Sequence, residues 1–65
     1  MPKFPHITVK LSGEDGNAFA ILGRVRMALR DAKVPKAEIN DFFNEATEGN
    51  YDHLLQTVMA WVEVE

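Results

Sequence analysis

An apolar stripe at helical spacing runs through residues 17–33 and constrains the fold more than any other feature of the chain. Its members recur every three or four residues and therefore share one face of an amphipathic helix at about 100° per residue. They are Ala18, Ile21, Leu22, Val25, Ala28, Leu29 and Ala32. Asp15 or Asn17 can cap this helix at its start. Val34 ends it, because the residue before a proline avoids the helical region.

Both ends of the chain alternate polar and apolar residues as short strands do. Residues 7–11 place Ile7, Val9 and Leu11 on one face, and residues 61–65 place Val62 and Val64 inward. A lone strand cannot satisfy its backbone hydrogen bonds, so we expect the two terminal strands to pair with each other. The pattern leaves open whether they run parallel or antiparallel.

Two shorter helices are predicted between the long helix and the last strand, over residues 35–48 and 53–60. Pro35 suits a helix start, Gly49 with Asn50 is a stop signal, and Asp52 is the expected cap of the last helix. The expected fold class is therefore α/β, in its α+β form. We expect one small domain over residues 1–65, in the order β-α-α-α-β, with three helices packed on a two-stranded sheet.

Composition narrows the class of protein. Sixty-five residues without cysteine can form neither a disulfide nor a thiolate metal site, so stability must come from an efficient core or from a homodimer. The net charge of −3 and a pI of about 5.2 argue against nucleic acid and membrane surfaces as partners. No apolar run approaches the ~18 residues of a membrane span, and the N-terminus lacks the apolar stretch of a signal peptide. We expect a cytoplasmic protein.

Two stretches carry a resemblance. Residues 8–25 read TVKLSGEDGNAFAILGRV, and residues 51–65 contain YDHLL and TVMAWVEVE. With these stretches the chain resembles, over nearly its whole length, a group of short bacterial proteins of uncharacterised function. The resemblance implies a complete small protein, and it implies no activity, cofactor or catalytic residue.

The turn before the long helix is one candidate site. It consists of Gly13, Glu14, Asp15, Gly16 and Asn17. Free N–H groups at a helix start attract anions, yet an anion here would meet two carboxylates. A cation would find only two adjacent acids, short of the alternating oxygen ligands of a calcium loop. We favour a capped turn, and keep small-ligand or cation binding as an alternative.

A basic stripe beside the apolar one is the first candidate for partner binding. We define it by Phe19, Gly23, Arg26, Arg30 and Lys33. Glycine within a helix costs about 1 kcal/mol against alanine, so we expect another element or a partner to approach closely at Gly23. In the interpretation that we favour, the cations are solvated or pair with acids of the second helix. Those acids are Glu38, Asp41, Glu45 and Glu48.

Signals for catalysis are weak. His6 and His53 have no metal-ligand partner at recognisable spacing, and Ser12 lies in no nucleophile motif. Trp61 is expected to close the core, with its indole N–H bonded to a carbonyl or water. An aromatic dimer surface formed by Phe4, Phe42 and Trp61 is the alternative. We expect no catalytic, cofactor-binding or metal-binding residue.

These observations favour a non-enzymatic protein–protein interaction module or accessory protein. Its partner would be acidic or amphipathic and would dock on the basic stripe, with a sheet edge as the second candidate surface. The partner's identity is open, and a second copy of the chain is one option. The alternative function is nucleic-acid binding through the same stripe.

Overall fold

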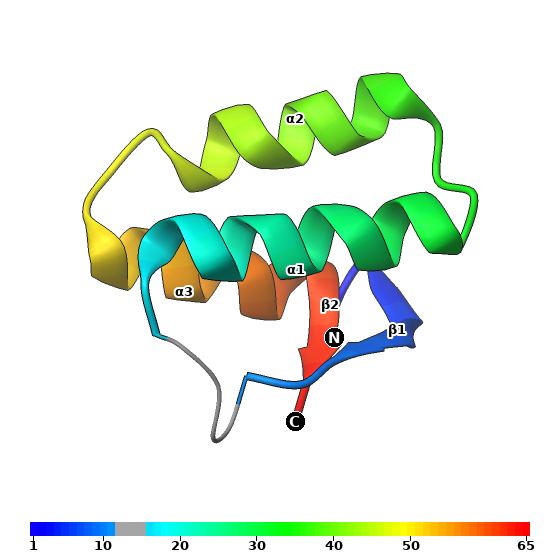
Figure 1. The fold of residues 1–65 in the computed structure, drawn as a ribbon, viewed down its shortest axis with the longest axis horizontal. Coiled ribbons are helices and arrows are strands. Elements are labelled where there is room, and N and C mark those ends of the chain that lie inside the picture. Colours follow the sequence, from blue (N-terminus) through cyan, green and yellow to red (C-terminus); the bar gives the residue numbers. More distant parts are fainter. Residues whose placement is uncertain (12–15) are drawn as a thin grey trace.

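The computed structural model describes residues 1–11 and 16–65 and places two strands and three helices in them (Figure 1). Their order is β1 (Phe4–Val9), α1 (Ala18–Asp31), α2 (Lys36–Ala46), α3 (Tyr51–Trp61) and β2 (Val62–Val64). The predicted order of strand, three helices and strand is confirmed. Helix α1 packs against α2, α3 and β1, so its apolar face is covered from several sides.

The two strands pair in parallel, which the sequence pattern left open. Phe4 pairs with Val62 and Val9 with Val64, with an irregularity in the register between Phe4 and Thr8. Parallel strands need a long crossover connection, which the three helices supply. β1 begins three residues earlier than predicted, because the extended chain after Pro2 already pairs: the Lys3 N–H donates to the Ala60 carbonyl at 2.8 Å.

The core forms where the apolar face of α1 meets the other elements. Of the predicted stripe, Ile21, Leu22, Val25 and Leu29 are buried, and the alanines at 18 and 28 are half-buried. Ala32 is exposed, contrary to the prediction, because α1 ends at Asp31. The helix stops two residues early in a left-handed turn at Lys33, whose φ is 65°.

Helix α3 begins earlier than predicted and has a different cap. The Asn50 side chain accepts the His53 N–H at 3.0 Å, so Asn50 is the cap and Asp52 lies in the first turn. At the start of α1, the Asn17 side chain accepts a hydrogen bond from the Phe19 N–H at 2.8 Å. Asn17 is therefore the cap, which is one of the two residues predicted for this role. α2 is shorter than predicted at both ends and stops at Ala46.

Three aromatic rings form the end of the core near the chain termini. Trp61 and Phe42 are buried and meet edge to face, with ring centroids 5.5 Å apart. The ring centroids of Phe4 and Trp61 are 5.9 Å apart. The expectation that Trp61 closes the core is confirmed, although its indole N–H donates to the Glu45 carboxylate and not to a carbonyl or water. With two of its three rings buried, this cluster is not the dimer surface considered above.

Candidate docking groove between the first two helices

The basic stripe lies on the solvent side of α1. Phe19, Gly23, Arg26 and Arg30 are all exposed, and the Phe19 side chain is 83% exposed. Lys33 follows the helix in the left-handed turn that ends it. A β-carbon added to Gly23 would meet no heavy atom within 4 Å among the described residues. Within residues 1–11 and 16–65, the expectation that another element of this chain approaches Gly23 is therefore wrong, and the expected approach of a partner stays a prediction.

Helices α1 and α2 run side by side in opposite directions (Figure 1). Their side chains line a groove between them. Its volume is about 590 Å³. The groove is lined by Gly23, Arg26, Met27 and Arg30 of α1, by Val34 of the connection, and by Lys36, Ile39 and Asn40 of α2. We call it the α1–α2 groove. It brings together Gly23, Arg26 and Arg30 of the basic stripe, while Phe19 and Lys33 lie outside its lining.

Five of the eight lining residues were not predicted as part of a site. Met27 is on α1 but just beside the stripe, and Lys36 and Asn40 sit on a helix whose facing side the sequence could not orient. Ile39 is only half-buried and contributes to the groove. The one available signal was the short connection between the two helices, because short connections make neighbouring helices antiparallel.

The charged groups of the groove all have one sign. Arg26, Arg30 and Lys36 line it without an acid, although the whole chain has a net charge of −3. Within residues 1–11 and 16–65, neither Arg26 nor Arg30 forms an ion pair. A positive groove on an acidic protein attracts anionic groups and repels cationic ones.

Two of the acids of α2 are engaged elsewhere. Glu38 pairs with Lys3 at 3.7 Å, and Glu45 accepts the Trp61 indole N–H at 2.7 Å. Both carboxylates therefore serve the side of α2 that faces the chain termini. Pairing of the basic stripe with these two acids is therefore wrong, whereas the other part of that interpretation, solvated cations, fits the exposed side chains of Arg26 and Arg30.

Packing holds one of the groove cations in place. The Arg26 guanidinium carbon lies 5.1 Å from the ring centroid of the half-buried Phe43. This cation–π contact restricts the side chain before any ligand arrives, so less conformational entropy is lost on binding. Between the cations, Met27 (56% exposed), Val34 and Ile39 present apolar surface. The groove is thus amphipathic, because its lining combines three cationic and three apolar side chains.

A smaller hollow of about 280 Å³ lies on the other side of α1, against β1. Its lining includes Lys10 and Arg24 but also Asp31, so its charge is mixed. Met27 borders both hollows. The exposed Met27 side chain therefore links the two surfaces across α1.

The glycine turn falls partly outside the described residues. Gly13, Glu14 and Asp15 belong to the segment that the structure does not describe. Of the two remaining members, Asn17 caps α1, and the Gly16 carbonyl accepts the hydroxyl of Tyr51. The Gly16 carbonyl therefore ties the start of α1 to α3, while Asn17 serves α1 itself.

Each of the two histidines contacts another residue of this chain. His53 is half-buried, and its Nε2–H donates to the Glu45 carbonyl at 2.8 Å, which ties α3 to the end of α2. His6 is exposed and meets the Phe4 ring edge to face. In the described part of the chain, no three His, Cys, Asp or Glu side chains are grouped closely enough to hold a metal ion.

Comparison with protein-family models, with curated proteins and with solved structures finds no match to this chain. The resemblance to short bacterial proteins stays a prediction, and the function has to be argued from the residues. Among the described residues, no helix has the length and apolar character needed to cross a membrane.

Proposed function

We propose that this protein is a non-enzymatic interaction module whose α1–α2 groove binds an acidic, amphipathic segment of a partner protein. The observation that carries the proposal is the lining of the groove: three cations and three apolar side chains without an acid, on a chain of net negative charge. Such a surface complements a helix that presents apolar side chains flanked by carboxylates, as in helix-in-groove recognition.

The chemistry of the lining favours binding over catalysis. The groove residues supply guanidinium, ammonium, amide and apolar groups, and none supplies a hydroxyl, thiol, imidazole or carboxylate. Of the side chains that commonly act in acid–base and nucleophilic mechanisms, the lining contains one lysine, Lys36, and no partner group to activate it. Arginine, in contrast, binds carboxylates through two parallel hydrogen bonds and is enriched at interface hot spots.

The sheet edge is the weaker candidate surface. β1 contains Pro5, which has no N–H to offer a further strand, and its register is irregular between Phe4 and Thr8. β2 is only three residues long. Short strands, prolines and bulges are features that protect an edge from pairing.

A designed helical peptide provides the test. It carries leucine at i, i+3, i+4 and i+7 on one face and glutamate on both flanks, with a fluorophore for anisotropy. We expect it to bind the wild-type protein, and a matched peptide with lysine in place of every glutamate not to bind. Arg30→Glu should weaken binding by roughly tenfold, which corresponds to about 1.4 kcal/mol.

Lys33→Glu is the matched control, because it makes the same change of charge three residues along the chain but outside the groove. This substitution should weaken binding of the peptide much less than Arg30→Glu does. Equal losses in the two variants would show unspecific charge attraction and refute the groove.

A single-stranded oligonucleotide tests the alternative. If it binds the same surface with an affinity that falls steeply with salt, and the peptide does not bind, the protein is a nucleic-acid-binding one and the proposal fails.

A further inference from the structure

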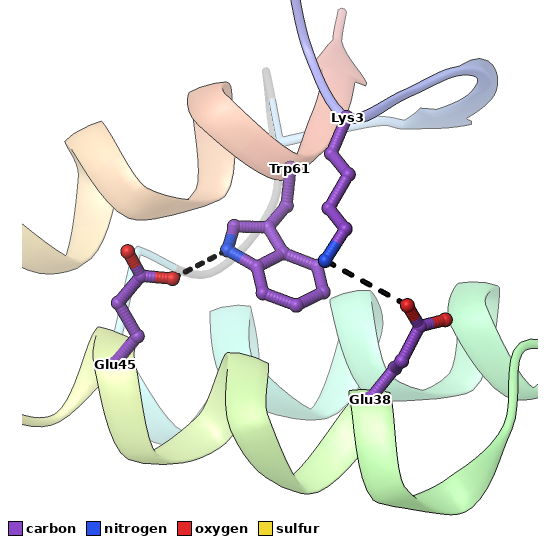
Figure 2. Close-up of polar contacts among 4 residues, drawn as sticks. All are labelled: Lys3, Glu38, Glu45 and Trp61. Atoms are coloured by element: carbon purple, nitrogen blue, oxygen red, sulfur yellow. Dashed lines mark hydrogen bonds and ion pairs between the residues drawn. The ribbon is translucent and has the colours of Figure 1, made fainter.

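The chain holds one of its own lysines in an aromatic and acidic site on the opposite side of α2 from the groove. Lys3, Trp61 and Glu38 form it, and Glu45 supports it (Figure 2). The Lys3 Nζ atom lies 4.3 Å from the centroid of the Trp61 ring and 3.7 Å from the Glu38 carboxylate. The Phe4 ring centroid is 5.9 Å from the same nitrogen.

These distances match the way proteins bind ammonium groups. A cation within about 6 Å of an aromatic centroid is attracted by the negative face of the ring, and tryptophan gives the strongest attraction. A carboxylate on the open side adds a direct charge. Two rings and one carboxylate therefore surround the Lys3 ammonium.

The walls of this site are fixed independently of the lysine side chain. The Trp61 N–H donates to the Glu45 carboxylate at 2.7 Å, as Figure 2 shows, and the buried Phe42 packs edge to face against the indole. The ring can rotate only if it breaks both contacts. Trp61 is thus oriented toward a cation whether or not one is bound.

The backbone of Lys3 is anchored as well. Its N–H donates to the Ala60 carbonyl, and the next residue, Phe4, pairs with Val62 in the sheet. The Lys3 side chain is 51% exposed and that of Glu38 is 38% exposed. The side chain can therefore swing into solvent while the backbone stays paired, which would open the face of Trp61 from outside.

We propose that Trp61, Phe4 and Glu38 form a binding site for an alkylammonium group, which Lys3 occupies as an internal ligand that an external ammonium group can replace. The site prefers the opposite charge from the α1–α2 groove, so it does not depend on the proposed function. Its ligand is the lysine side chain or a methylated ammonium of a second molecule.

Trp61 is the only tryptophan of the chain, so its fluorescence reports on the site directly. The probe is choline, titrated into the full-length wild-type chain and into Lys3→Ala. Removing the internal competitor, whose local concentration is high, should lower the apparent dissociation constant for choline by about tenfold or more. Butylammonium, titrated in the same way, shows whether the site prefers a primary or a quaternary ammonium.

Two controls separate a cation site from an apolar patch. The neutral carbon isostere of choline should give no saturable change in the Lys3→Ala protein. Adding Glu38→Gln to Lys3→Ala should weaken choline several-fold, because the carboxylate is lost while the rings stay.

The proposal fails if folded Lys3→Ala binds choline no better than wild type, or binds the neutral isostere equally well. Far-UV circular dichroism establishes that the variant is folded. If Lys3→Ala does not fold, Lys3→Gln replaces it. Its uncharged amide can still contact Glu38 but competes poorly for the rings, and the same outcomes apply.

Discussion

At the scale of single residues, two adjacent phenylalanines have very different surroundings. The Phe42 ring is fully buried against Trp61, whereas Phe43 is half-buried and carries Arg26 on its face. Phe42→Ala should cost about 3–5 kcal/mol, the usual loss for a buried aromatic ring. That is comparable to the whole stability expected of so small a core, about 3–5 kcal/mol, so the variant should be largely unfolded.

Phe43→Ala is the control for this prediction. It removes the same atoms one position away but should cost less than about 2 kcal/mol and leave a cooperative transition. Urea unfolding followed by circular dichroism measures both variants. Equal losses would mean that the two rings share the core. From sequence, the pair predicts one inward and one outward ring without saying which, because both positions flank the apolar face of the helix.

Two glycines also differ in their surroundings. A β-carbon at Gly23 meets open space, while one at Gly49 would lie 2.9 Å from the Cβ and Cγ atoms of His53. Gly23→Ala should therefore stabilise the protein by about 1 kcal/mol, because alanine is the better helix former. For a domain of this size, that gain raises Tm by about 4–8 °C. Gly49→Ala should lower Tm, and a rise in Tm for that variant would contradict the close contact.

At the scale of elements, helix ends are where sequence and structure differ most. Pro35 predicts the end of α1 to within two residues, because the residue before a proline avoids helical geometry. The structure adds how the helix stops: the Val34 N–H donates to Leu29 and the Lys33 N–H to Arg30, a Schellman motif. The residue in the left-handed position is Lys33, where glycine is usual.

Lys33→Gly should consequently stabilise the protein by roughly 0.5–1 kcal/mol. The left-handed conformation costs a residue with a β-carbon about 1–2 kcal/mol, and the extra freedom of glycine in the unfolded chain offsets about 0.4–1 kcal/mol. Thermal unfolding measures the change. Lys33→Ala is the control, since it removes the same side chain but keeps the β-carbon; an equal gain for alanine would assign the effect to the lost charge instead.

The start of α3 shows why sequence alone chose the wrong cap. Asn50 and Asp52 are both good capping residues, and local preference does not separate them. In the structure Tyr51 already belongs to the helix, and its hydroxyl bonds to the Gly16 carbonyl, 35 residues away. A contact between residues so far apart in the sequence cannot be predicted from the local pattern. In the structure it occurs together with the earlier start of α3.

At the scale of the whole molecule, periodicity was enough to predict the architecture but not the groove. The apolar stripe of α1 and the alternating termini lead to the β-α-α-α-β order, because each must bury one face. The α1–α2 groove depends in addition on how two helices pack. The pattern of a single helix was enough to predict Gly23, Arg26 and Arg30 as site residues. Predicting Lys36 and Asn40 would have required knowing how the two helices are rotated relative to each other.

The same arrangement of charges bears on the homodimer that the composition left open. A two-fold interface apposes the same patch of both copies, so a dimer through the α1–α2 groove would bring Arg26, Arg30 and Lys36 against their own counterparts. Such apposition of like charges destabilises the contact. We therefore expect light scattering to give the monomer mass of 7.3 kDa across a wide concentration series at low salt.

Two other outcomes would contradict this expectation in distinguishable ways. A mass that reaches a plateau at twice the monomer value would indicate a closed dimer through another face. A mass that keeps rising with concentration would indicate open, head-to-tail contacts. In such a contact the α1–α2 groove of one copy meets the side of α2 that carries Glu38 and Glu45 on the next copy. Arg30→Glu separates them, because it should abolish the head-to-tail contact and leave a closed dimer through a distant face unchanged.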